Sequence, residues 1–489
     1  MNLPMRGVLV GFPSLVLAAC ASTPPASTPA DADLAITNVA VVDVERGRVE
    51  PGHDVLVRDG RIVAVGPTGR AARASGVRTI DGSGRFLIPG LWDMHAHLHL
   101  SGNPLNVEMP LLVAHGVTGV RVMGAARPVF DTATTPMFDL HRQWQARIDS
   151  GTLTGPRILA LASWPVNGEA GINANLPDFY RARTREEGAQ LARYFKGHDF
   201  DFIKVYNNVS REGFLGLAEE ARRLGIPFAG HEPSSLSAIE ISNAGQRSLE
   251  HSRIFLFNCW SGADSARRRL LQLPPTAMRR RMVDGYDPAM CAEVFRTFAR
   301  NRTYITPTHV TRRMDAFAHD SSFRNDPRLK YIPRLQRMNW GADANRMVAS
   351  DSSPEGRRSF MDFYTRGLQL TRDAYRAGVP VMLGTDAGDS FVFPGASVHD
   401  ELQELVKAGL TPAEALRAAT LSGAEYLGRA NEFGTVAVGR RADLVLLDAS
   451  PLDDVANTKR IRAVFLAGRV LERAALDSML ASVEAVARK

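Results

Sequence analysis

The chain has 489 residues, of which 45% are hydrophobic and 23% charged, and its formal net charge is +7. This ordinary globular composition excludes extended disorder and leaves enough length for a large core. The positive charge permits binding to acidic surfaces, but the densest basic runs, 267–269 and 279–281, have no interleaved aromatic residues and no nucleic-acid motif. We therefore expect no nucleic-acid partner.

Residues 1–19 have the pattern of a secretory signal peptide. Arg6 supplies a positive charge, an apolar stretch follows over 8–17, and small residues come next. The apolar part is much shorter than the roughly 20 residues that a membrane-spanning helix needs. We expect this segment to be cleaved.

The sequence LAAC at 17–20 resembles the bacterial lipobox. The resemblance implies that Cys20 is lipidated and anchors the protein at the bacterial cell envelope, facing the periplasm or at the outer membrane. Residues 20–33 are rich in small residues and proline, which predicts a flexible, lipid-anchored tether. Outside the cytoplasm Cys259 and Cys291 could form a disulfide. Two separate buried thiols are the alternative, because the sequence does not define the distance between them.

The two ends of the chain share a strand-like texture. Residues 34–87 and 433–475 alternate apolar and polar residues between turn signals, so we expect them to pair into one small β-sandwich. A short helix is expected over 476–489.

Short apolar runs alternate with helical patterns over residues 88–432, which predicts a (β/α)₈ TIM barrel and an α/β fold class. The expected barrel strands are Leu91–His97, Gly119–Met123, Arg157–Leu161, Phe202–Tyr206, two strands ending at His231 and His251, Tyr304–Thr308 and Val379–Thr385. The stretch 255–301 is longer than a plain connection, so we expect it to overhang the mouth of the barrel.

Chemistry-bearing residues follow these strands. His95 and His97 lie two apart on a strand, so they share a face and can bind one metal ion. Candidate ligands also end four later strands, which brings them to the catalytic face of a barrel. These further candidates are Lys204, His231, His251 and Asp386.

With this set, the chain resembles the amidohydrolase superfamily from about residue 34 to 471, including the segments 409–428 and 434–451. The resemblance implies two divalent metal ions, expected to be zinc. It places His95, His97 and Asp386 on the more buried ion. It places His231 and His251 on the more exposed ion. It further implies that Lys204 is carboxylated by carbon dioxide and bridges both ions.

The position of Lys204 also argues for its modification. It lies among the apolar residues 202–206, where a bare ammonium is costly to bury. A neighbouring carboxylate that pairs with the lysine is the alternative.

The expected chemistry is hydrolysis by a metal-bridging hydroxide. Asp386 is the candidate general base, which would pass the proton to the leaving amine. Tyr206 faces the same way as Lys204, so its hydroxyl could donate to the substrate carbonyl, although an aromatic packed at the rim is the alternative. His309 and Arg121 are further candidate substrate contacts, and Val122 stands where the family often has an acid.

These residues predict an amidohydrolase that cleaves the peptide-type C–N bond of a small substrate, such as a dipeptide or an N-acyl amino acid. A mononuclear deaminase or cyclic-amide hydrolase is the first alternative, because Glu232 follows His231 where such enzymes place a catalytic acid. A non-catalytic envelope binding protein is the second, but it would be expected to lose ligands. The sequence leaves the oligomeric state open, a homo-oligomer included.

Overall fold

The computed structural model describes residues 32–69, 76–98, 102–124, 137–168, 180–251, 258–260 and 273–489. The expected signal peptide and Cys20 lie outside the described residues, as does most of the expected tether. Within the described part of the chain, no helix is both long enough and apolar enough to cross a membrane.

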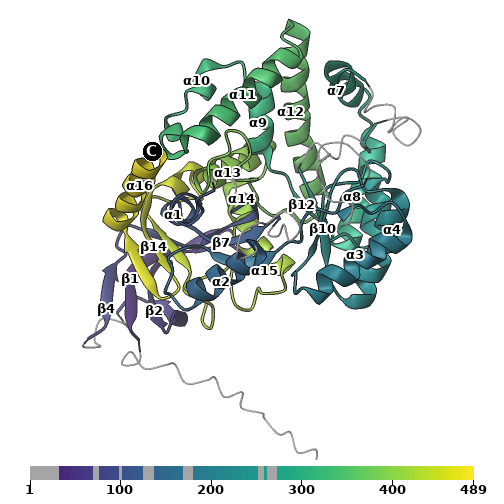
Figure 1. Ribbon diagram of the computed structural model, residues 1–489. Coiled ribbons are helices and arrows are strands. Elements are labelled where there is room, and N and C mark those ends of the chain that lie inside the picture. The colour runs from purple at the N-terminus through teal and green to yellow at the C-terminus, as the bar shows by residue number, and fades with distance from the viewer. Residues whose placement is uncertain are drawn as a thin grey trace, which may run out of the picture.

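Strands from both ends of the chain form one mixed sheet, in the order β15-β14-β13-β5-β1-β2-β3, with β4 paired to β1. Its strands are β1 (Leu34–Asp43), β2 (Arg48–Arg58), β3 (Arg61–Pro67), β4 (Arg78–Asp81), β5 (Phe86–Pro89), β13 (Leu444–Leu447), β14 (Ile461–Leu466) and β15 (Arg469–Glu472). The junction is the antiparallel pair β5–β13, in which Ile88 lies opposite Val445. The purple and yellow strands accordingly lie side by side (Figure 1). The two packed layers of the expected sandwich stay a prediction.

The local sequence explains how this sheet begins. Asp59 and Gly60 both have positive φ, at 52° and 70°, which matches the tight turn that an Asp-Gly pair favours between antiparallel strands. This turn sets β2 against β3, and alternate apolar residues of the sheet then meet in one buried cluster. The hairpin follows directly from the turn signal in the sequence.

Seven parallel strands form two further sheets, β6-β7-β8 and β12-β11-β10-β9. They are β6 (Leu91–Ala96), β7 (Val117–Val122), β8 (Arg157–Leu161), β9 (Ile203–Val205), β10 (Phe228–Gly230), β11 (Ser248–Glu250) and β12 (Tyr304–Thr306). Every residue of these strands is buried, as expected for parallel strands with both faces covered.

The expected eighth strand, 379–385, is not a regular strand. Only Val381 makes a bridge there, to Ile305 of β12. Pro380 has no N–H to donate, and Asp386 has left-handed backbone geometry with φ 65°, so continuous pairing is interrupted. The segment nevertheless accepts hydrogen bonds from both sides, at Pro380 O from Ile305 and at Leu383 O from Met94 of β6.

The edges of the two parallel sheets also meet elsewhere. Two bridges join them there, one from Ala162, just after β8, to Phe202, just before β9, and one from Val166 to Val205 of β9. The two sheets are therefore linked by isolated bridges on both sides rather than by a continuous ladder.

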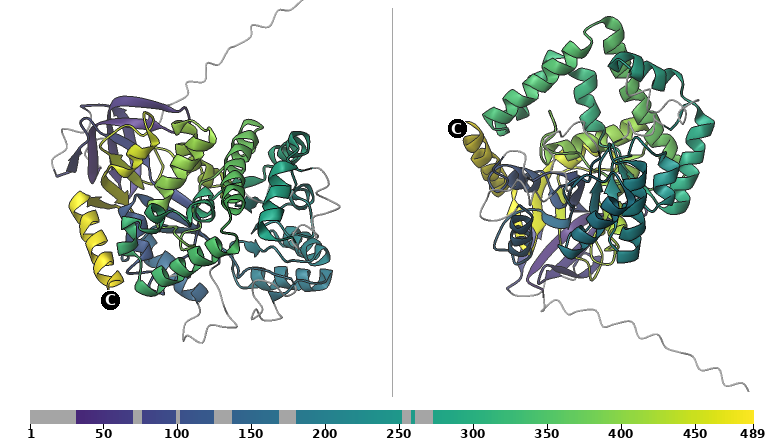
Figure 2. Two further views of the ribbon diagram at one scale, coloured as in Figure 1. Left: turned by 90° about the horizontal axis from the view of Figure 1, so that it is seen from above. Right: turned by 45° about the vertical axis from the view of Figure 1, so that its right-hand side comes forward.

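Helices cover the strands and rise above their carboxyl ends (Figures 1 and 2). They are α1 (Glu108–Ala114), α2 (Met137–Asp149), α3 (Arg185–Gly197), α4 (Arg211–Leu224), α5 (Ala238–Asn243), α7 (Pro275–Asp284), α8 (Pro288–Asn301), α9 (His309–Phe317), α10 (Ser321–Arg324), α11 (Arg334–Ser350), α12 (Pro354–Arg376), α13 (Ala396–Ala408), α14 (Pro412–Ala418), α15 (Leu421–Tyr426) and α16 (Arg473–Ala487), with the 3₁₀ helices η4 (Pro327–Tyr331) and η5 (Val455–Lys459).

A disulfide bond joins Cys259 to Cys291 of α8, and both residues are buried. Of the two possibilities that the sequence left open, a disulfide and two separate buried thiols, the structure has the disulfide. The bond fastens the short described segment 258–260 to α8, and Asn258 of that segment contacts Glu232, just after β10.

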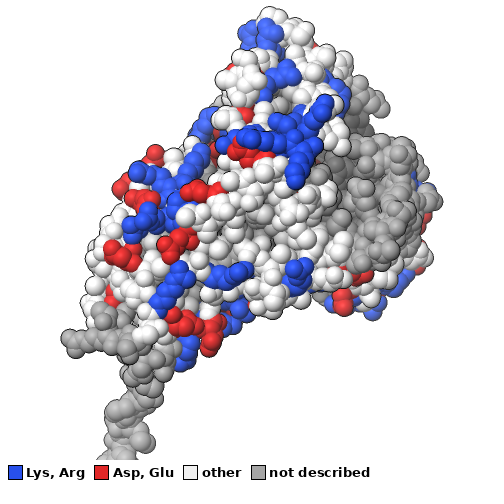
Figure 3. All heavy atoms as spheres, turned by 60° about the vertical axis from the view of Figure 1, so that its left-hand side comes forward, with Lys and Arg blue, Asp and Glu red and all other residues white. Residues whose placement is uncertain are grey.

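Charged side chains of both signs occur over the surface. On the face in Figure 3, acidic residues accompany the basic ones, notably around the upper helices. Within the basic run 279–281, Arg280 is engaged by the carboxylates of Asp284, Glu355 and Asp362.

Candidate metal centre

Six side chains predicted from the sequence as metal ligands gather at the carboxyl ends of the parallel strands. His95 is on β6 and His97 follows it, Lys204 is on β9, and the others come directly after β10, β11 and the eighth segment. Those three are His231, His251 and Asp386. Loop and strand-end residues at one face of parallel strands are the usual source of catalytic groups.

The inner part of the centre consists of His95, His97 and Asp386. Asp386 Oδ1 lies 3.3 Å from His95 Nε2 and 3.1 Å from His97 Nε2. One ligand atom from each of the three residues lies within 4.8 Å of the others. Two imidazole nitrogens and a carboxylate oxygen at this spacing form a donor set that can hold one divalent ion.

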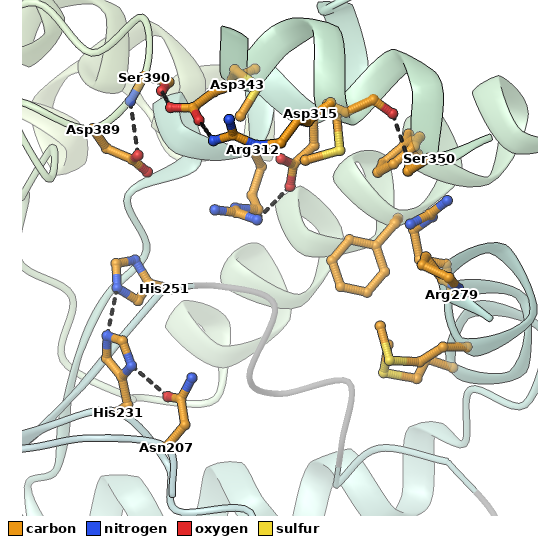
Figure 4. A pocket seen from close by; sticks show the side chains of 18 of the residues that line it. Asn207, His231, His251, Arg279, Arg312, Asp315, Asp343, Ser350, Asp389 and Ser390 are labelled. Atoms are coloured by element: carbon orange, nitrogen blue, oxygen red, sulfur yellow. Dashed lines mark hydrogen bonds and ion pairs between the residues drawn. The ribbon is translucent and has the colours of Figure 1, made fainter. Parts of the chain in front are cut away.

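The outer part is the histidine pair shown in Figure 4, in which His231 Nε2 lies 3.0 Å from His251 Nε2. His251 Nε2 is also 3.8 Å from Asp386 Oδ2, which connects the outer pair to the inner group. Lys204 Nζ lies 3.5 Å from His95 Nε2. The structure therefore brings all six residues into one cluster, while their roles stay predictions.

Hydrogen bonds on the far side of three imidazole rings orient them. His95 Nδ1 donates to Glu250 Oε2 at 2.9 Å, and His231 Nδ1 donates to Asn207 Oδ1. His251 Nδ1 lies 2.7 Å from Thr308 Oγ1. With Nδ1 engaged, each ring presents Nε2 to the common space, which is how protein partners orient metal-binding histidines.

The backbone is held in an unusual conformation at the strand ends. His251, Thr308 and Asp386 have φ values of 71°, 45° and 65°, in the left-handed region that residues with a side chain rarely adopt. Asp93 stabilises this arrangement, since its carboxylate accepts hydrogen bonds from the backbone N–H groups of His95 and Thr385. Backbone strain of this kind is found at functional sites, where the surrounding structure holds it in place.

Lys204 is buried, with 2% of its surface exposed. Among the described residues, no carboxylate oxygen lies within 4.0 Å of its Nζ. Burial lowers the lysine pKa to about 8, against the opposing attraction of Glu250 and Asp386. The alternative in which an acidic side chain pairs directly with the lysine therefore finds no partner in the described part of the chain.

His95 and Asp386 of the inner group have the charge states that metal ligands need. Burial lowers the pKa of His95 to about 4, so its neutral form dominates at pH 7. Burial alone would raise the pKa of Asp386, but its electrostatic interactions with the imidazoles of His95, His97 and His251 and a hydrogen bond from His97 lower it well below its usual value. A neutral imidazole and an ionised carboxylate are both ready to bind a cation.

A buried ion pair that sequence reasoning missed lies behind His95. Arg121 Nη2 donates to the two carboxylate oxygens of Glu250 at 2.8 and 2.9 Å, and Ser248 Oγ donates to the same carboxylate at 2.6 Å. Burial raises the pKa of Glu250, but Arg121 and His95 outweigh it and keep the carboxylate ionised. The available signal was a charged residue within each of two predicted strands, Arg121 in one and Glu250 in the other.

Two predicted substrate contacts occupy different positions from those expected. Arg121 is fully buried, and its hydrogen bonds go to Glu250, Ser248, Tyr426 and the backbone of Met94, so it supports the centre from behind. His309 is also fully buried, and its Nε2 lies 3.0 Å from Thr371 Oγ1 of α12. Neither residue lines the cavity described below, so the structure does not place them as substrate contacts.

Tyr206 lies beside the outer pair. Its ring stacks on that of His231, with the two centroids 4.4 Å apart and the planes inclined by 29°. Its role as a hydrogen-bond donor stays a prediction.

A cavity of about 750 Å³, called the pocket below, opens beside the outer pair. His231 and His251 line one side (Figure 4), and Glu232 is also among the lining residues. The other walls include residues of α7, α9, α11 and α12, among them the apolar side chains of Pro275, Met278, Met282, Met314, Met347, Phe360 and Phe363. Part of the expected overhang, α7, thus borders the pocket, but α9, α11 and α12 contribute walls that the sequence did not predict.

Glu232 is buried in the wall of the pocket. Asn258 Nδ2 donates to its two carboxylate oxygens at 2.8 and 2.9 Å. The disulfide of the neighbouring Cys259 holds Asn258 in position. The structure therefore provides a fixed carboxylate next to His231, which the first alternative function requires.

Residues 86–471 match the sequence profile of the amidohydrolase family. A dihydroorotase from Desulforapulum autotrophicum is 27% identical over 238 residues, in an alignment covering 46% of this chain and 55% of that protein. The chain therefore spans about half the length of this curated relative. An imidazolonepropionase from Geobacillus kaustophilus is 26% identical over 425 residues, which cover 82% of this chain and 85% of that protein.

Solved structures share the fold along nearly the whole chain. Bottromycin amidohydrolase superposes with a TM-score of 0.71 at 24% identity and covers 93% of this chain and 90% of its own. A Xaa-Pro dipeptidase with methionine bound in its active site superposes with a TM-score of 0.63 at 18% identity. The superposition covers 90% of this chain and 99% of the dipeptidase chain. At these identities the likeness establishes the fold.

Proposed function

Because the chain belongs to the amidohydrolase family, we propose that it is a metal-dependent hydrolase that cleaves an amide bond of a small substrate. The observation that carries this proposal is the convergence of four imidazole Nε2 atoms and the Asp386 carboxylate at one set of strand ends. Supporting hydrogen bonds from outside the cluster leave those atoms available for cations.

We propose further that the parallel strands form an eight-stranded (β/α)₈ barrel. The two parallel sheets are linked by a bridge between Ala162 and Phe202, and the segment carrying Asp386 accepts hydrogen bonds from both β6 and β12. Such a barrel would present every candidate ligand at its mouth.

The proposed centre binds two divalent ions, which we expect to be zinc. His95, His97 and Asp386 would hold the inner ion and His231 with His251 the outer one. Carboxylation of Lys204 by carbon dioxide would give it two oxygens to share between them. When bound, such ions lower the pKa of water and polarise a carbonyl group, which is the chemistry that amide hydrolysis needs.

The side chains of this chain have separate tasks in the proposed reaction. Asp386 would accept the proton of the attacking water and deliver it to the leaving amine nitrogen. Tyr206 would donate a hydrogen bond from its hydroxyl to the substrate carbonyl oxygen. Glu250 would keep the ring of His95 in its tautomer and orientation.

A dipeptide or an N-acyl amino acid is the proposed substrate class. A cavity of about 750 Å³ has room for a molecule of this size beside the outer pair. The names of two structural neighbours, an amidohydrolase and a Xaa-Pro dipeptidase, support amide-bond substrates.

The test is a screen of dipeptides and N-acyl amino acids with the zinc-loaded protein lacking residues 1–20. We expect release of free amino acid that a chelator abolishes and added zinc restores, with Asp386→Asn as the matched inactive control. Hydrolysis that persists after complete metal removal would contradict the proposal.

A mononuclear deaminase or cyclic-amide hydrolase is the second candidate. The position of Glu232 favours it, because this buried carboxylate lies beside His231 in the wall of the pocket. The number of metal ions bound per chain separates the two functions. Two ions support the binuclear centre, and one ion with activity that depends on Glu232 supports the alternative.

We also propose that the mature protein is lipid-anchored at Cys20 in the bacterial cell envelope. The lipobox-like sequence suggests it, and the disulfide between Cys259 and Cys291 is consistent with an oxidising compartment. Cys20→Ser should move the protein from the membrane fraction to the soluble fraction without changing its turnover. Unchanged membrane association of that variant would contradict the anchor.

A further inference from the structure

Three arginines line the pocket, and they differ in their partners. Arg312 forms an ion pair with Asp315, and Arg346 forms one with Asp343. Arg279 of α7 has no carboxylate oxygen within 4.0 Å among the described residues. It is the arginine of this trio whose charge is not directly neutralised.

Arg279 is nevertheless buried, with 6% of its surface exposed. Its Nε donates to Ser359 Oγ at 2.9 Å and its NH2 to Thr276 Oγ1 at 3.0 Å, and both partners are uncharged. The guanidinium also stacks on Phe360, with its central carbon 3.4 Å from the ring centroid. Stacking and neutral hydrogen bonds hold the group in one orientation but do not cancel its charge.

Burial acts on this residue as expected for a cation without a close counterion. It lowers the pKa of Arg279, and Asp315 and Asp351 oppose this effect only from a distance. The guanidinium remains charged at neutral pH, because arginine does not lose its proton in proteins. A buried charge of this kind is stabilised when an anion enters the pocket.

The position of Arg279 suggests where that anion belongs. Figure 4 shows it on the opposite side of the pocket from His231 and His251. The wall around it is apolar, with Met278 and Met282 on the same helix and Phe360 and Phe363 on α12. Methionine side chains are flexible and polarisable, so such a wall adapts to varied apolar groups.

We propose that Arg279 is a specificity-determining residue that binds the terminal carboxylate of the substrate. The scissile amide would lie at the metal centre, and the apolar side chain next to the carboxylate would contact the methionine and phenylalanine wall. The substrate class is therefore a peptide or N-acyl amino acid with a free carboxylate and an apolar C-terminal side chain. This inference rests on the proposed amide hydrolysis.

The kinetic test varies the charge of the protein and of the substrate together. The two substrates are L-methionyl-L-methionine and its C-terminal amide, which differ in the carboxylate alone, with the released C-terminal product measured by mass spectrometry. We expect wild-type kcat/KM to be about ten- to a hundredfold higher for the acid, which is the range for one charge-assisted pair. In Arg279→Met the preference should disappear, with the change mainly in KM.

Two further variants control for the fold of α7. Arg279→Lys keeps the charge but loses the two-pronged geometry, so it should keep part of the preference. Arg280→Met changes the next residue, whose partners Asp284, Glu355 and Asp362 lie outside the pocket, and should keep the full preference. A preference that survives in Arg279→Met, or its absence in the wild type, would overturn the proposal.

A binding measurement distinguishes failure of this inference from failure of the proposed function. If neither dipeptide is hydrolysed, the proposed substrate is wrong, and calorimetric titration of N-acetyl-L-methionine and N-acetyl-L-methioninamide decides the role of Arg279. The metal-loaded Asp386→Asn protein, which prevents turnover, should bind the acid at least about tenfold more tightly than the amide. Adding Arg279→Met should remove that difference. Equal affinities, or no saturable binding of the acid, would overturn the proposal.

Discussion

The two sides of the candidate metal centre are supported in different ways. On the inner side, His95 is backed by Glu250, whose charge is matched by Arg121, and all three side chains are buried. On the outer side, His231 and His251 are backed by neutral groups and border the pocket. The first arrangement is enclosed and has its charges compensated, while the second borders the pocket that a ligand would enter.

This difference suggests a division of labour. A charged partner raises the basicity of a histidine ligand more than a neutral one does, so the inner site should hold its ion more firmly. The outer site should exchange its ion more readily and respond more to the substrate. Lys204 lies 3.5 Å from His95 and connects the two sides in the proposed centre.

The largest effect is expected for Lys204→Ala, because it removes the proposed bridge between the two sides. Metal content and activity should fall together, to background. Short carboxylic acids in excess should restore part of both by occupying the vacated space. Lys204→Arg should not be rescued, because a guanidinium stays cationic and repels the ions. Full metal occupancy in Lys204→Ala, measured by mass spectrometry, would remove the residue from the bridge.

Asp386→Asn should lower kcat by at least about a hundredfold, since it removes the proposed base and keeps the shape of the side chain. The inner ion should be lost only in part, because His95 and His97 remain. Steady-state kinetics and circular dichroism of the same preparation check both statements. A variant with near-normal kcat would exclude Asp386 as the base.

Glu250→Gln tests the charged support of the inner side. It should weaken metal binding by about ten- to a hundredfold, because His95 loses its ionised partner. It should also lower the free energy of unfolding by roughly 3–5 kcal/mol, because Arg121 is left as an unpaired buried charge. In the double variant with Arg121→Met, the loss of stability should be smaller than the sum of the two single losses. Additive losses in denaturant titrations would mean that the pair is not coupled.

Asn207→Ala tests the neutral support of the outer side and should have the smallest effect. His231 loses a hydrogen-bond partner but no charge is left unpaired, so metal affinity should fall by about tenfold at most. The loss should be confined to one of two ions in a zinc titration. An effect larger than that of Glu250→Gln would reverse the comparison between the two sides.

Much of the centre can be inferred from the sequence because its signals are local. The spacing of His95 and His97 identifies a shared strand face, and the apolar neighbours of Lys204 identify a buried amine. The structure agrees with both inferences about position. The strand boundaries also agree where apolar runs are continuous, as in Arg157–Leu161.

The remainder depends on contacts between residues far apart in the chain. Arg121 and Glu250 are 129 positions apart, and nothing local indicates that their charges meet behind His95. The left-handed backbone at His251 and Asp386 likewise depends on the surrounding structure, since Asp and His adopt it more often than most residues with a side chain but still only in a minority of cases. The irregular segment around Pro380 could have been anticipated from the missing N–H alone.

The central claim is that two ions share one centre through a modified lysine. A crystal structure of the zinc-loaded protein, with anomalous scattering recorded at the zinc edge, tests it most directly. We predict two zinc peaks, one beside His95, His97 and Asp386 and one beside His231 and His251, with carboxylate density extending from Lys204 Nζ between them. A single fully occupied zinc peak with an unmodified Lys204 amine would contradict the account and favour the mononuclear alternative.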